Sequence, residues 1–183
     1  MRIISGSKRG KTLFTPKSDN IRPTSDKARE AIYNILYNLL DAPISEYTIL
    51  DIFAGTGALG LEGLSRGAKS ATFIDLDTTL AQKNAKLCGF NNLEFIKRNS
   101  LTLGYSSKKY NLIFMDAPYN QGLTLPTLKN LATNNWCDKN AILIVEVARD
   151  EEFSIDNELN NFYKILDERI YGAAKVFILE FIG

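Results

Sequence analysis

A glycine-rich segment and an acidic residue downstream of it form the first candidate site in this chain of 183 residues. Gly55, Gly57 and Gly60 satisfy the spacing GxGxxG between an apolar run and an expected helix. Glycines let the backbone turn sharply and approach a ligand closely, and a helix N-terminus adds free N–H donors. Asp75 follows Gly55 by twenty positions, and an acid there can bind both hydroxyls of a ribose. Taken alone, this pattern predicts a nucleoside site and fits a dinucleotide as well as other nucleosides.

Asp51, which precedes the glycines, separates the nucleoside ligands by charge. Its carboxylate can engage the amino group of a cofactor that carries an amino acid, whereas it would repel a dinucleotide pyrophosphate at close range. S-adenosylmethionine has an amino acid and no phosphate, so we expect it as the cofactor. Leu76 is expected to pack on its adenine ring and Asn99 to bond the adenine amine, although both residue types also suit an ordinary turn. The predicted cofactor-binding residues are Asp51, Phe53, Ala54, Gly55, Gly57, Asp75, Leu76, Asn99 and Ser100.

The second candidate site is the motif Asp116-Ala117-Pro118-Tyr119, at the end of another apolar run. It resembles the (Asp/Asn)-Pro-Pro-(Tyr/Phe) signature of methyltransferases that act on exocyclic amines, with Ala117 in place of the first proline. Such an amine is a poor nucleophile because its lone pair is delocalised into the ring. A side-chain oxygen and a backbone carbonyl can accept its two N–H bonds and orient the nitrogen. We expect Asp116 and the Ala117 carbonyl to do this, with Tyr119 stacking on a base flipped out of its helix. Alanine lacks the fixed φ of proline, which predicts a less preorganised loop.

Both motifs lie in a region of alternating apolar runs and helix-length segments that begins after Pro43. Apolar runs this short, bounded by Gly, Pro and Asn, predict a parallel sheet covered by helices on both faces. The last two strands leave no room for a helix between them, so they are expected to pair antiparallel. The expected strands are Tyr47–Ile52, Ser70–Asp75, Leu93–Lys97, Asn111–Met115, Ala141–Val147, Phe162–Leu166 and Lys175–Phe181, and the expected helices are Leu59–Ser65, Thr78–Leu87 and Leu123–Thr133.

The N-terminal part of the chain has a different pattern. Arg2–Ile4 and Lys11–Phe14 are the expected strands of a hairpin. Thr24 or Ser25 is a suitable cap for a following helix, whose apolar stripe runs from Ala28 to Leu40. Residues 1–30 hold eight basic and three acidic side chains, a net charge of +5, although the whole chain carries only +1. A basic arm of this kind suggests a polyanionic partner, while a merely solvated, charge-rich terminus is equally consistent with it.

The overall composition excludes several classes of protein. With 45% hydrophobic and 23% charged residues, the chain matches ordinary globular usage, which argues against disorder and against a disulfide scaffold. It has no histidine, which excludes histidine-based triads, zinc sites and general bases. Cys88 and Cys137 form no CxxC pair and are expected to be buried thiols, without a metal. No apolar run approaches the length of a membrane span, so we expect a cytoplasmic protein. We also expect a monomer. The acidic stretch Asp150–Glu158 is expected to be a solvated loop.

Nearly the whole chain resembles the RsmD family, the 16S rRNA (guanine-N2)-methyltransferases. The segments that carry the resemblance are MRIISG at residues 1–6, RPTSD at 22–26, LDIFAGTGALGLE at 50–62, SRGA at 65–68, and Tyr171-Gly172 followed by Lys175-Val176. The resemblance implies an α/β fold of the Rossmann-like class I S-adenosylmethionine-dependent methyltransferases. That fold has a mostly parallel seven-stranded sheet with an antiparallel last strand, here preceded by an N-terminal β-hairpin. It also implies that the target is one guanine of 16S rRNA in an assembled or partly assembled small subunit.

On this basis we divide the chain into a basic hairpin extension, residues 1–20, and a methyltransferase domain, residues 21–183. The extension and the block after it are expected to grip RNA phosphates without reading sequence. The predicted RNA contacts are Arg2, Lys8, Arg9, Lys11, Arg22 and Thr24.

Three other functions remain open at the level of sequence. An adenine-N6 methyltransferase would use the same amine-orienting motif, and only the family resemblance favours guanine. A nicotinamide-dependent oxidoreductase would use the GxGxxG spacing, but Asp51 and the Asp116 motif argue against it. A non-catalytic RNA-binding module would have no need of Asp116.

Overall fold

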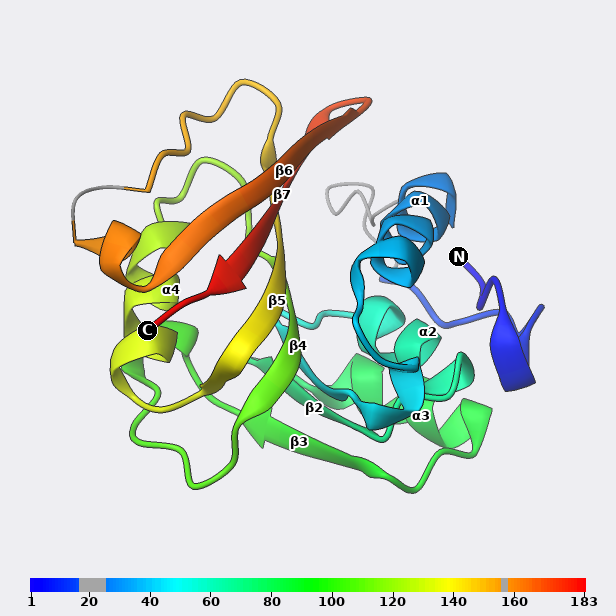
Figure 1. The fold of residues 1–183 in the computed structure, drawn as a ribbon. Helices are drawn as coiled ribbons and strands as arrows, with labels where there is room; N and C mark the ends of the chain where they lie inside the picture. The colour runs from blue at the N-terminus through cyan, green and yellow to red at the C-terminus, as the bar shows by residue number, and fades with distance from the viewer. Residues whose placement is uncertain (17–25, 156–157) are drawn as a thin grey trace.

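A computed structural model describes residues 1–16, 26–155 and 158–183 of the chain (Figure 1). Within these residues the strands form a seven-stranded sheet in the order β3-β2-β1-β4-β5-β7-β6. Strands β1 to β5 pair in parallel, and β7 pairs antiparallel with both β5 and β6. The elements are η1 (Gly6–Lys8), α1 (Asp26–Leu39), η2 (Ile44–Glu46), β1 (Thr48–Ile52), α2 (Ala58–Ser65), β2 (Ser70–Asp75), α3 (Thr79–Cys88), β3 (Leu93–Lys97), η3 (Ser100–Thr102), β4 (Tyr110–Asp116), α4 (Thr124–Thr133), β5 (Cys137–Ala148), η4 (Leu159–Asn161), β6 (Tyr163–Tyr171) and β7 (Ala174–Phe181).

Helices cover both faces of the sheet, as the sequence predicts for short, continuously apolar strands. Helices α1, α2 and α3 contribute to a core on one face, and α4 contributes to a second core on the other (Figure 1). Alternate residues of each strand enter the two cores: in β4, for example, Phe114 packs on the α1–α3 side and Met115 on the α4 side. The predicted parallel sheet with an antiparallel end is therefore confirmed.

Strand β6 is longer than its sequence pattern indicates. It was expected to end at Leu166, yet it continues to Tyr171 through a register shift between Ile165 and Asp167. Most of its side chains are exposed, because β6 is the outermost strand of the sheet. The outer part of β6 is held by backbone hydrogen bonds to β7. Such bonds require no alternation of apolar side chains, so the sequence pattern does not reveal this part of the strand. The turn to β7 is correspondingly tight, with Gly172 at φ 62°.

The acidic stretch after β5 is a loop, as expected, but two of its apolar side chains are not solvated. Phe153 and Ile155 pack against the α4-side core. The Phe153 ring lies 4.5 Å from the ring of Phe177, centroid to centroid. Glu151 accepts a hydrogen bond from the backbone N–H of Asn120 at 3.0 Å. The stretch therefore packs partly on the body of the protein, while Asp150, Glu152 and Glu158 are exposed.

The N-terminal hairpin forms, but with a single bridge rather than two strands. Arg2 pairs antiparallel with Thr12, and the Leu13 N–H donates to the Met1 carbonyl at 3.1 Å. Ile3 and Leu13 are buried in the α1–α3-side core, so the hairpin is packed against the body of the protein. The predicted capping residues Thr24 and Ser25 lie outside the described residues.

Both cysteines are buried and free, as expected. Burial raises the pKa of the Cys137 thiol to about 12, which keeps it protonated and unreactive at neutral pH.

Candidate active site

The two sequence motifs meet at the point where the strand order reverses. Strand β1 lies between β2 and β4, so the connections from β1 and β4 leave their carboxyl ends on opposite sides of the sheet. In open α/β sheets, ligands bind in the crevice outside the carboxyl ends of the strands at such a switch point. The glycine loop follows β1, and the Asp116 motif follows β4. The topology thus brings together residues more than fifty positions apart.

Acidic side chains from neighbouring strands face the same side of the sheet here. In register, Asp51 of β1 lies between Phe73 of β2 and Phe114 of β4, both of which belong to the α1–α3-side core. Side chains alternate along a strand, so Asp75 and Asp116, two residues further along β2 and β4, point to that same side. Each is the last residue of its strand.

A fourth acid on this face, Glu146 of β5, was missed by sequence reasoning. It is paired in register with Asp116, so the two side chains lie next to each other on adjacent strands. Its side chain is buried, with 5% of the residue exposed. A signal was present in the sequence: Glu146 is the single charged residue in the apolar run AILIVEVA, residues 141–148. A charge in such a run is costly unless it has partners, which makes it a candidate functional residue.

Two of the acids hold the glycine loop by hydrogen bonds to its backbone. Asp75 Oδ2 accepts from the Gly55 N–H at 2.8 Å, and Asp51 Oδ2 accepts from the Gly60 N–H at 2.9 Å. Gly60 lies in α2, where a Cβ would come within 2.5 Å of the Phe73 ring. The third glycine of the motif is therefore required for packing the helix on the sheet, not for contact with a ligand.

The start of the loop has the conformation expected of a ligand cradle. Phe53 and Gly55 both adopt positive φ, 59° and 52°, and for phenylalanine this is a strained conformation that the surrounding structure must hold. A Cβ on Gly55 would meet only the Phe53 carbonyl, at 3.9 Å, so one side of the loop is open. Backbone strain of this kind gathers at ligand clamps, which agrees with the predicted cofactor role of this segment.

Asp51 is buried, with 2% of the residue exposed. Burial raises the pKa of its carboxyl group to about 7, with a further contribution from the negative charge of Asp75 and an opposing one from the Gly60 N–H. A buried carboxylate that is costly to ionise is stabilised most by a cationic partner. No residue from Phe53 to Ala58 carries a positive charge, so the loop itself does not supply that partner. The site therefore suits an ammonium group and disfavours a pyrophosphate.

The predicted adenine-side residues lie beyond the ends of β2 and β3. Leu76, next to Asp75, is 67% exposed and presents an apolar side chain to solvent. Asn99 Oδ1 accepts from the Leu101 N–H at 2.9 Å, so this oxygen caps the short helix η3. Ser100 is buried, and its hydroxyl accepts from Thr127 Oγ1 of α4 at 3.2 Å. The side-chain oxygens of Asn99 and Ser100 thus have structural partners.

The second motif forms a loop with anchors at both ends. Ala117 is buried directly after β4, whereas Pro118 and Tyr119 are exposed, Tyr119 by 37%. The Tyr119 hydroxyl donates to Glu146 Oε1 at 2.5 Å. Asn120 follows at φ 56° and is held by Glu151 through its backbone N–H. The aromatic ring at the carboxyl end of β4 is therefore tied to β5 and to the segment after it.

The hairpin that carries the basic residues is fastened to α2 and to the glycine loop. Glu62 is fully buried and accepts from the backbone N–H groups of Ile4 and Ser5, at 2.7 and 3.0 Å. Asn84 of α3 donates to the carbonyl oxygens of Phe14 and Thr56, at 3.0 and 2.9 Å. The hairpin is thereby held beside the cofactor loop.

The predicted RNA-contacting side chains of the hairpin differ in exposure. Arg9 and Lys11 are exposed, while Lys8 is half-buried with its Nζ 5.7 Å from the centre of the Phe90 ring. Arg2 is exposed, and its Nε lies 3.7 Å from Asp26 Oδ2. Arg22 and Thr24 lie outside the described residues.

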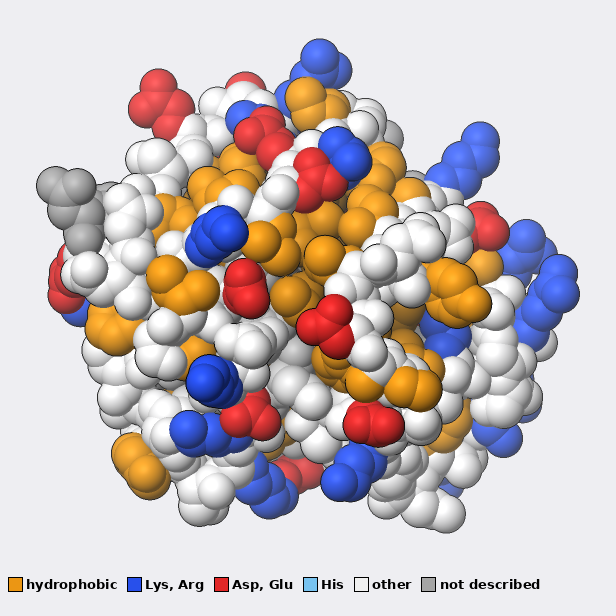
Figure 2. Space-filling view, in the orientation of Figure 1, with side chains coloured by type: hydrophobic (Ala, Val, Ile, Leu, Met, Phe, Trp, Pro, Cys, Tyr) orange, Lys and Arg blue, Asp and Glu red, His pale blue; other side chains and the backbone are white. Residues whose placement is uncertain are grey.

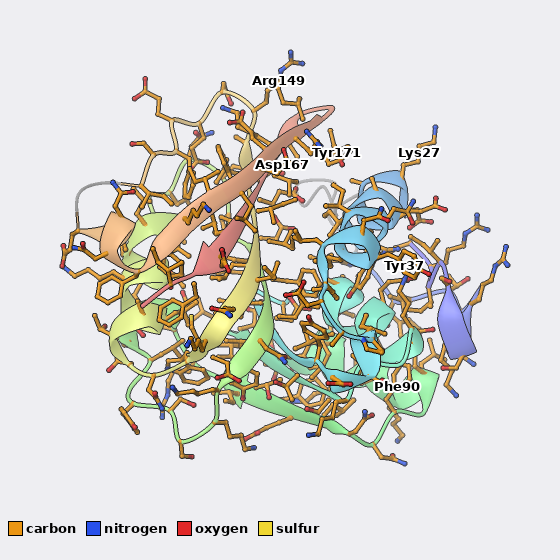
Figure 3. The ribbon with its side chains drawn as sticks, in the orientation of Figure 1. Lys27, Tyr37, Phe90, Arg149, Asp167 and Tyr171 are labelled. Carbon is orange, nitrogen blue, oxygen red and sulfur yellow. The ribbon has the colours of Figure 1, made fainter. Side chains whose placement is uncertain are left out.

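Figure 3 places further side chains around this end of the molecule. Tyr171 lies at the tip of the β6–β7 hairpin, Arg149 follows β5 beside that tip, and Lys27 projects from the first turn of α1. Figure 2 shows hydrophobic side chains gathered on the face between that hairpin and α1. Ile35 of α1 and Leu166 of β6 are partly buried against the α1–α3-side core. Among the described residues no cluster of His, Cys, Asp or Glu could hold a metal ion. No helix in the described ranges is long and apolar enough to span a membrane.

Comparison with known proteins gives one consistent result. A sequence model of the family described as "Conserved hypothetical protein 95" matches residues 1–180. The ribosomal RNA small subunit methyltransferase D of Escherichia coli strain K12 is 38% identical over 151 residues, which are 80% of this chain and 74% of that protein. Its counterpart from Haemophilus influenzae is 35% identical over 159 residues, 82% of this chain and 80% of the relative. The solved structure of Escherichia coli yhhF superposes with a TM-score of 0.81 at 30% identity, covering 100% of this chain and 98% of that one. The chain belongs to the conserved hypothetical protein 95 family, together with the ribosomal RNA small subunit methyltransferases D.

Proposed function

We propose that this protein transfers a methyl group from S-adenosylmethionine to the exocyclic N2 of one guanine in 16S rRNA, within an assembled or partly assembled small subunit. One observation carries the proposal: a cofactor-type glycine loop with two acids and an amine-orienting motif lie on one face at one switch point. The relatives named as small-subunit rRNA methyltransferases support an rRNA substrate, and the family resemblance supports the guanine N2.

The residues of the glycine loop fit S-adenosylmethionine. Asp51 would receive the cofactor ammonium, and Asp75 the ribose hydroxyls, while keeping its bond to the Gly55 N–H. The adenine would lie over Leu76, near Asn99. When bound, this cofactor supplies an electrophilic methyl group on a sulfonium. An oxidoreductase acting with a dinucleotide is less well supported, because the buried Asp51 would repel a pyrophosphate and no residue from Phe53 to Ala58 carries a positive charge to offset it.

The Asp116 motif would bind and orient the target amine. Asp116 and the Ala117 carbonyl each accept one N–H bond, which directs the nitrogen lone pair at the methyl carbon. The methyl group held there would pass to this nitrogen, and the electron pair of its bond to sulfur would stay with sulfur. The nitrogen then loses one proton, and Asp116 is positioned to accept it and pass it to water. Tyr119 stacks on the flipped base.

RNA would dock along the side of the molecule on which α1 lies between the N-terminal hairpin and the β6–β7 tip (Figure 1). Arg9 and Lys11 are exposed on the hairpin, and Lys27 and Arg149 are exposed nearer the switch point. Phosphate contacts of this kind give affinity and register without reading sequence.

Neutralising exposed hairpin charges should weaken binding to the small subunit and reduce its salt dependence. In the double variant Arg9→Gln, Lys11→Gln we expect the slope of log affinity against log salt to become shallower by roughly 1.5, because fewer counterions are released. Particle affinity measured at several salt concentrations checks this. Point variants are preferable to deleting the hairpin, since Ile3 and Leu13 belong to the core.

The matched control is Lys139→Gln, Lys164→Gln, which removes two exposed charges from β5 and from the edge strand β6, away from the hairpin. This variant should keep the wild-type slope. Parallel slopes for the hairpin variant and wild type would contradict the docking role and favour a merely solvated terminus.

Two measurements test the proposed function as a whole. Calorimetric titration should detect binding of S-adenosylmethionine and none of NAD. Incubation of unmethylated small subunits with labelled cofactor should then place the label on a guanine N2 in 16S rRNA, identified by nuclease digestion and mass spectrometry. Label on an adenine N6 would replace the guanine assignment with the adenine one, and NAD binding alone would overturn the methyltransferase assignment.

A further inference from the structure

Glu146 occupies a position in this site that the chemistry described so far does not use. It is paired in register with Asp116, on the same side of the sheet. The residue is almost fully buried, and its carboxylate accepts the Tyr119 hydroxyl bond at 2.5 Å. It therefore touches the residue proposed to stack on the base and neighbours the residue proposed to orient the amine.

The edge of guanine that carries N2 presents three N–H donors. The amine presents two N–H groups, which Asp116 and the Ala117 carbonyl would take. The adjacent ring nitrogen N1 presents a third N–H. Leaving a donor unpaired inside a closed site costs much more than one ordinary hydrogen bond contributes. The second buried carboxylate beside Asp116, that of Glu146, offers the N1–H an acceptor of its own, while Asp116 and the Ala117 carbonyl orient the amine.

We propose that Glu146 accepts the N1–H of the target guanine and thereby selects guanine over bases whose corresponding nitrogen is an acceptor. This inference rests on the proposed function and deepens it. A carboxylate offers about four acceptor positions, so accepting the Tyr119 hydroxyl does not exhaust it. In adenine and in 2-aminopurine the equivalent ring nitrogen has a lone pair instead of a proton, and a carboxylate repels it.

The bond to Tyr119 gives this selection a fixed geometry. The hydroxyl holds the Glu146 carboxylate at the edge of the Tyr119 ring, so a base stacked on that ring has its donor edge close to the carboxylate. Strand β5 itself is held on both sides, by β4 and by β7, where Val176 is the register partner of Glu146. A carboxylate on an interior strand is a more rigid reading group than one on a loop.

The test compares guanine with 2-aminopurine at the methylated position. 2-Aminopurine keeps the exocyclic amine at the same carbon but has no N1–H. Small subunits are reconstituted with 16S rRNA that carries either base at the position mapped with the wild-type enzyme. The kcat/KM for methyl transfer is then measured on both substrates for wild type, Glu146→Gln and Tyr119→Phe.

We expect wild type to prefer guanine by roughly 10- to 100-fold, the discrimination typical of a specific base contact. Glu146→Gln should reduce that ratio by about 10-fold or more, because the glutamine amide can donate to an unprotonated ring nitrogen. Tyr119→Phe should lower activity on both substrates and reduce the ratio by less than Glu146→Gln does, because the hydroxyl only positions the carboxylate that does the reading. A merely structural role for Glu146 would lower both activities equally and leave the ratio unchanged.

Three results would overturn the proposal: a wild type that does not discriminate, a Glu146→Gln ratio equal to that of wild type, or a ratio lost equally in Tyr119→Phe. The comparison of the two substrates with the wild-type enzyme does not depend on the folding of any variant. Cofactor affinity and thermal unfolding of each variant show whether the fold is kept. Failure of the proposed function would look different, because the wild-type enzyme would then methylate no guanine in the first place.

Discussion

Asp116→Ala should lower kcat/KM for methylation of the small subunit by roughly 100- to 10,000-fold, the range typical of losing a group that positions and deprotonates the reacting atom. Affinity for S-adenosylmethionine should stay within about twofold of wild type, because Asp116 lies at the end of β4 and the glycine loop is held by Asp75 and Asp51. Affinity for the particle should also persist, since it depends on phosphate contacts elsewhere.

Single-turnover methylation, calorimetry with the cofactor and particle binding together separate these effects. Asp138→Ala is the matched control, because it removes an exposed carboxylate at the opposite end of the sheet, at the start of β5, and should change none of the three. Activity of Asp116→Ala within a factor of ten of wild type would remove Asp116 from the chemistry. A parallel loss of cofactor binding would mean that the substitution disturbs the whole switch point.

Asp51→Asn should weaken S-adenosylmethionine binding by roughly 10- to 100-fold at pH 8, because it removes a charged acceptor for the ammonium group. The variant should also abolish a pH dependence. The pKa of Asp51 is raised to about 7 by burial, so in wild type the carboxyl is protonated below pH 7 and ionised above it. Cofactor affinity of wild type should therefore rise from about pH 6 to about pH 8 and then level off, while that of Asp51→Asn stays flat over this range.

The same raised pKa predicts the opposite effect on the stability of the protein without cofactor. Between the unfolded value of 3.8 and the folded value of about 7, the folded state binds the extra proton, so stability falls as pH rises. Above pH 7 the buried carboxylate costs on the order of a few kcal/mol. Asp51→Asn should thus unfold at a higher temperature than wild type at pH 8, and this gain should shrink at pH 5. Equal affinity and equal stability of the two proteins at pH 8 would contradict the ammonium-binding role.

The architecture and both site motifs can be predicted from the sequence alone, because each has a local signature. Short apolar runs separated by helix-length segments require a covered parallel sheet, and the core strands match their predicted bounds within a few residues, except that β5 begins four residues earlier. The glycine spacing and the strand-end acids Asp51, Asp75 and Asp116 are likewise local patterns, and the topology rule places the ends of such strands at one edge.

Features that depend on partners distant in the chain were decided only by the tertiary structure. The register of β4 and β5 puts Glu146 beside Asp116, thirty positions away, and no local pattern encodes a register. The hairpin is bound to the body of the protein because Glu62 accepts the Ile4 and Ser5 N–H groups. The basic segment, which its sequence alone would suggest is a free arm, is therefore packed against the core. The outer half of β6 is held by backbone bonds to β7, which its exposed side chains do not reveal. Side-chain periodicity reports what each segment buries, whereas strand order, register and backbone pairing determine which segments meet.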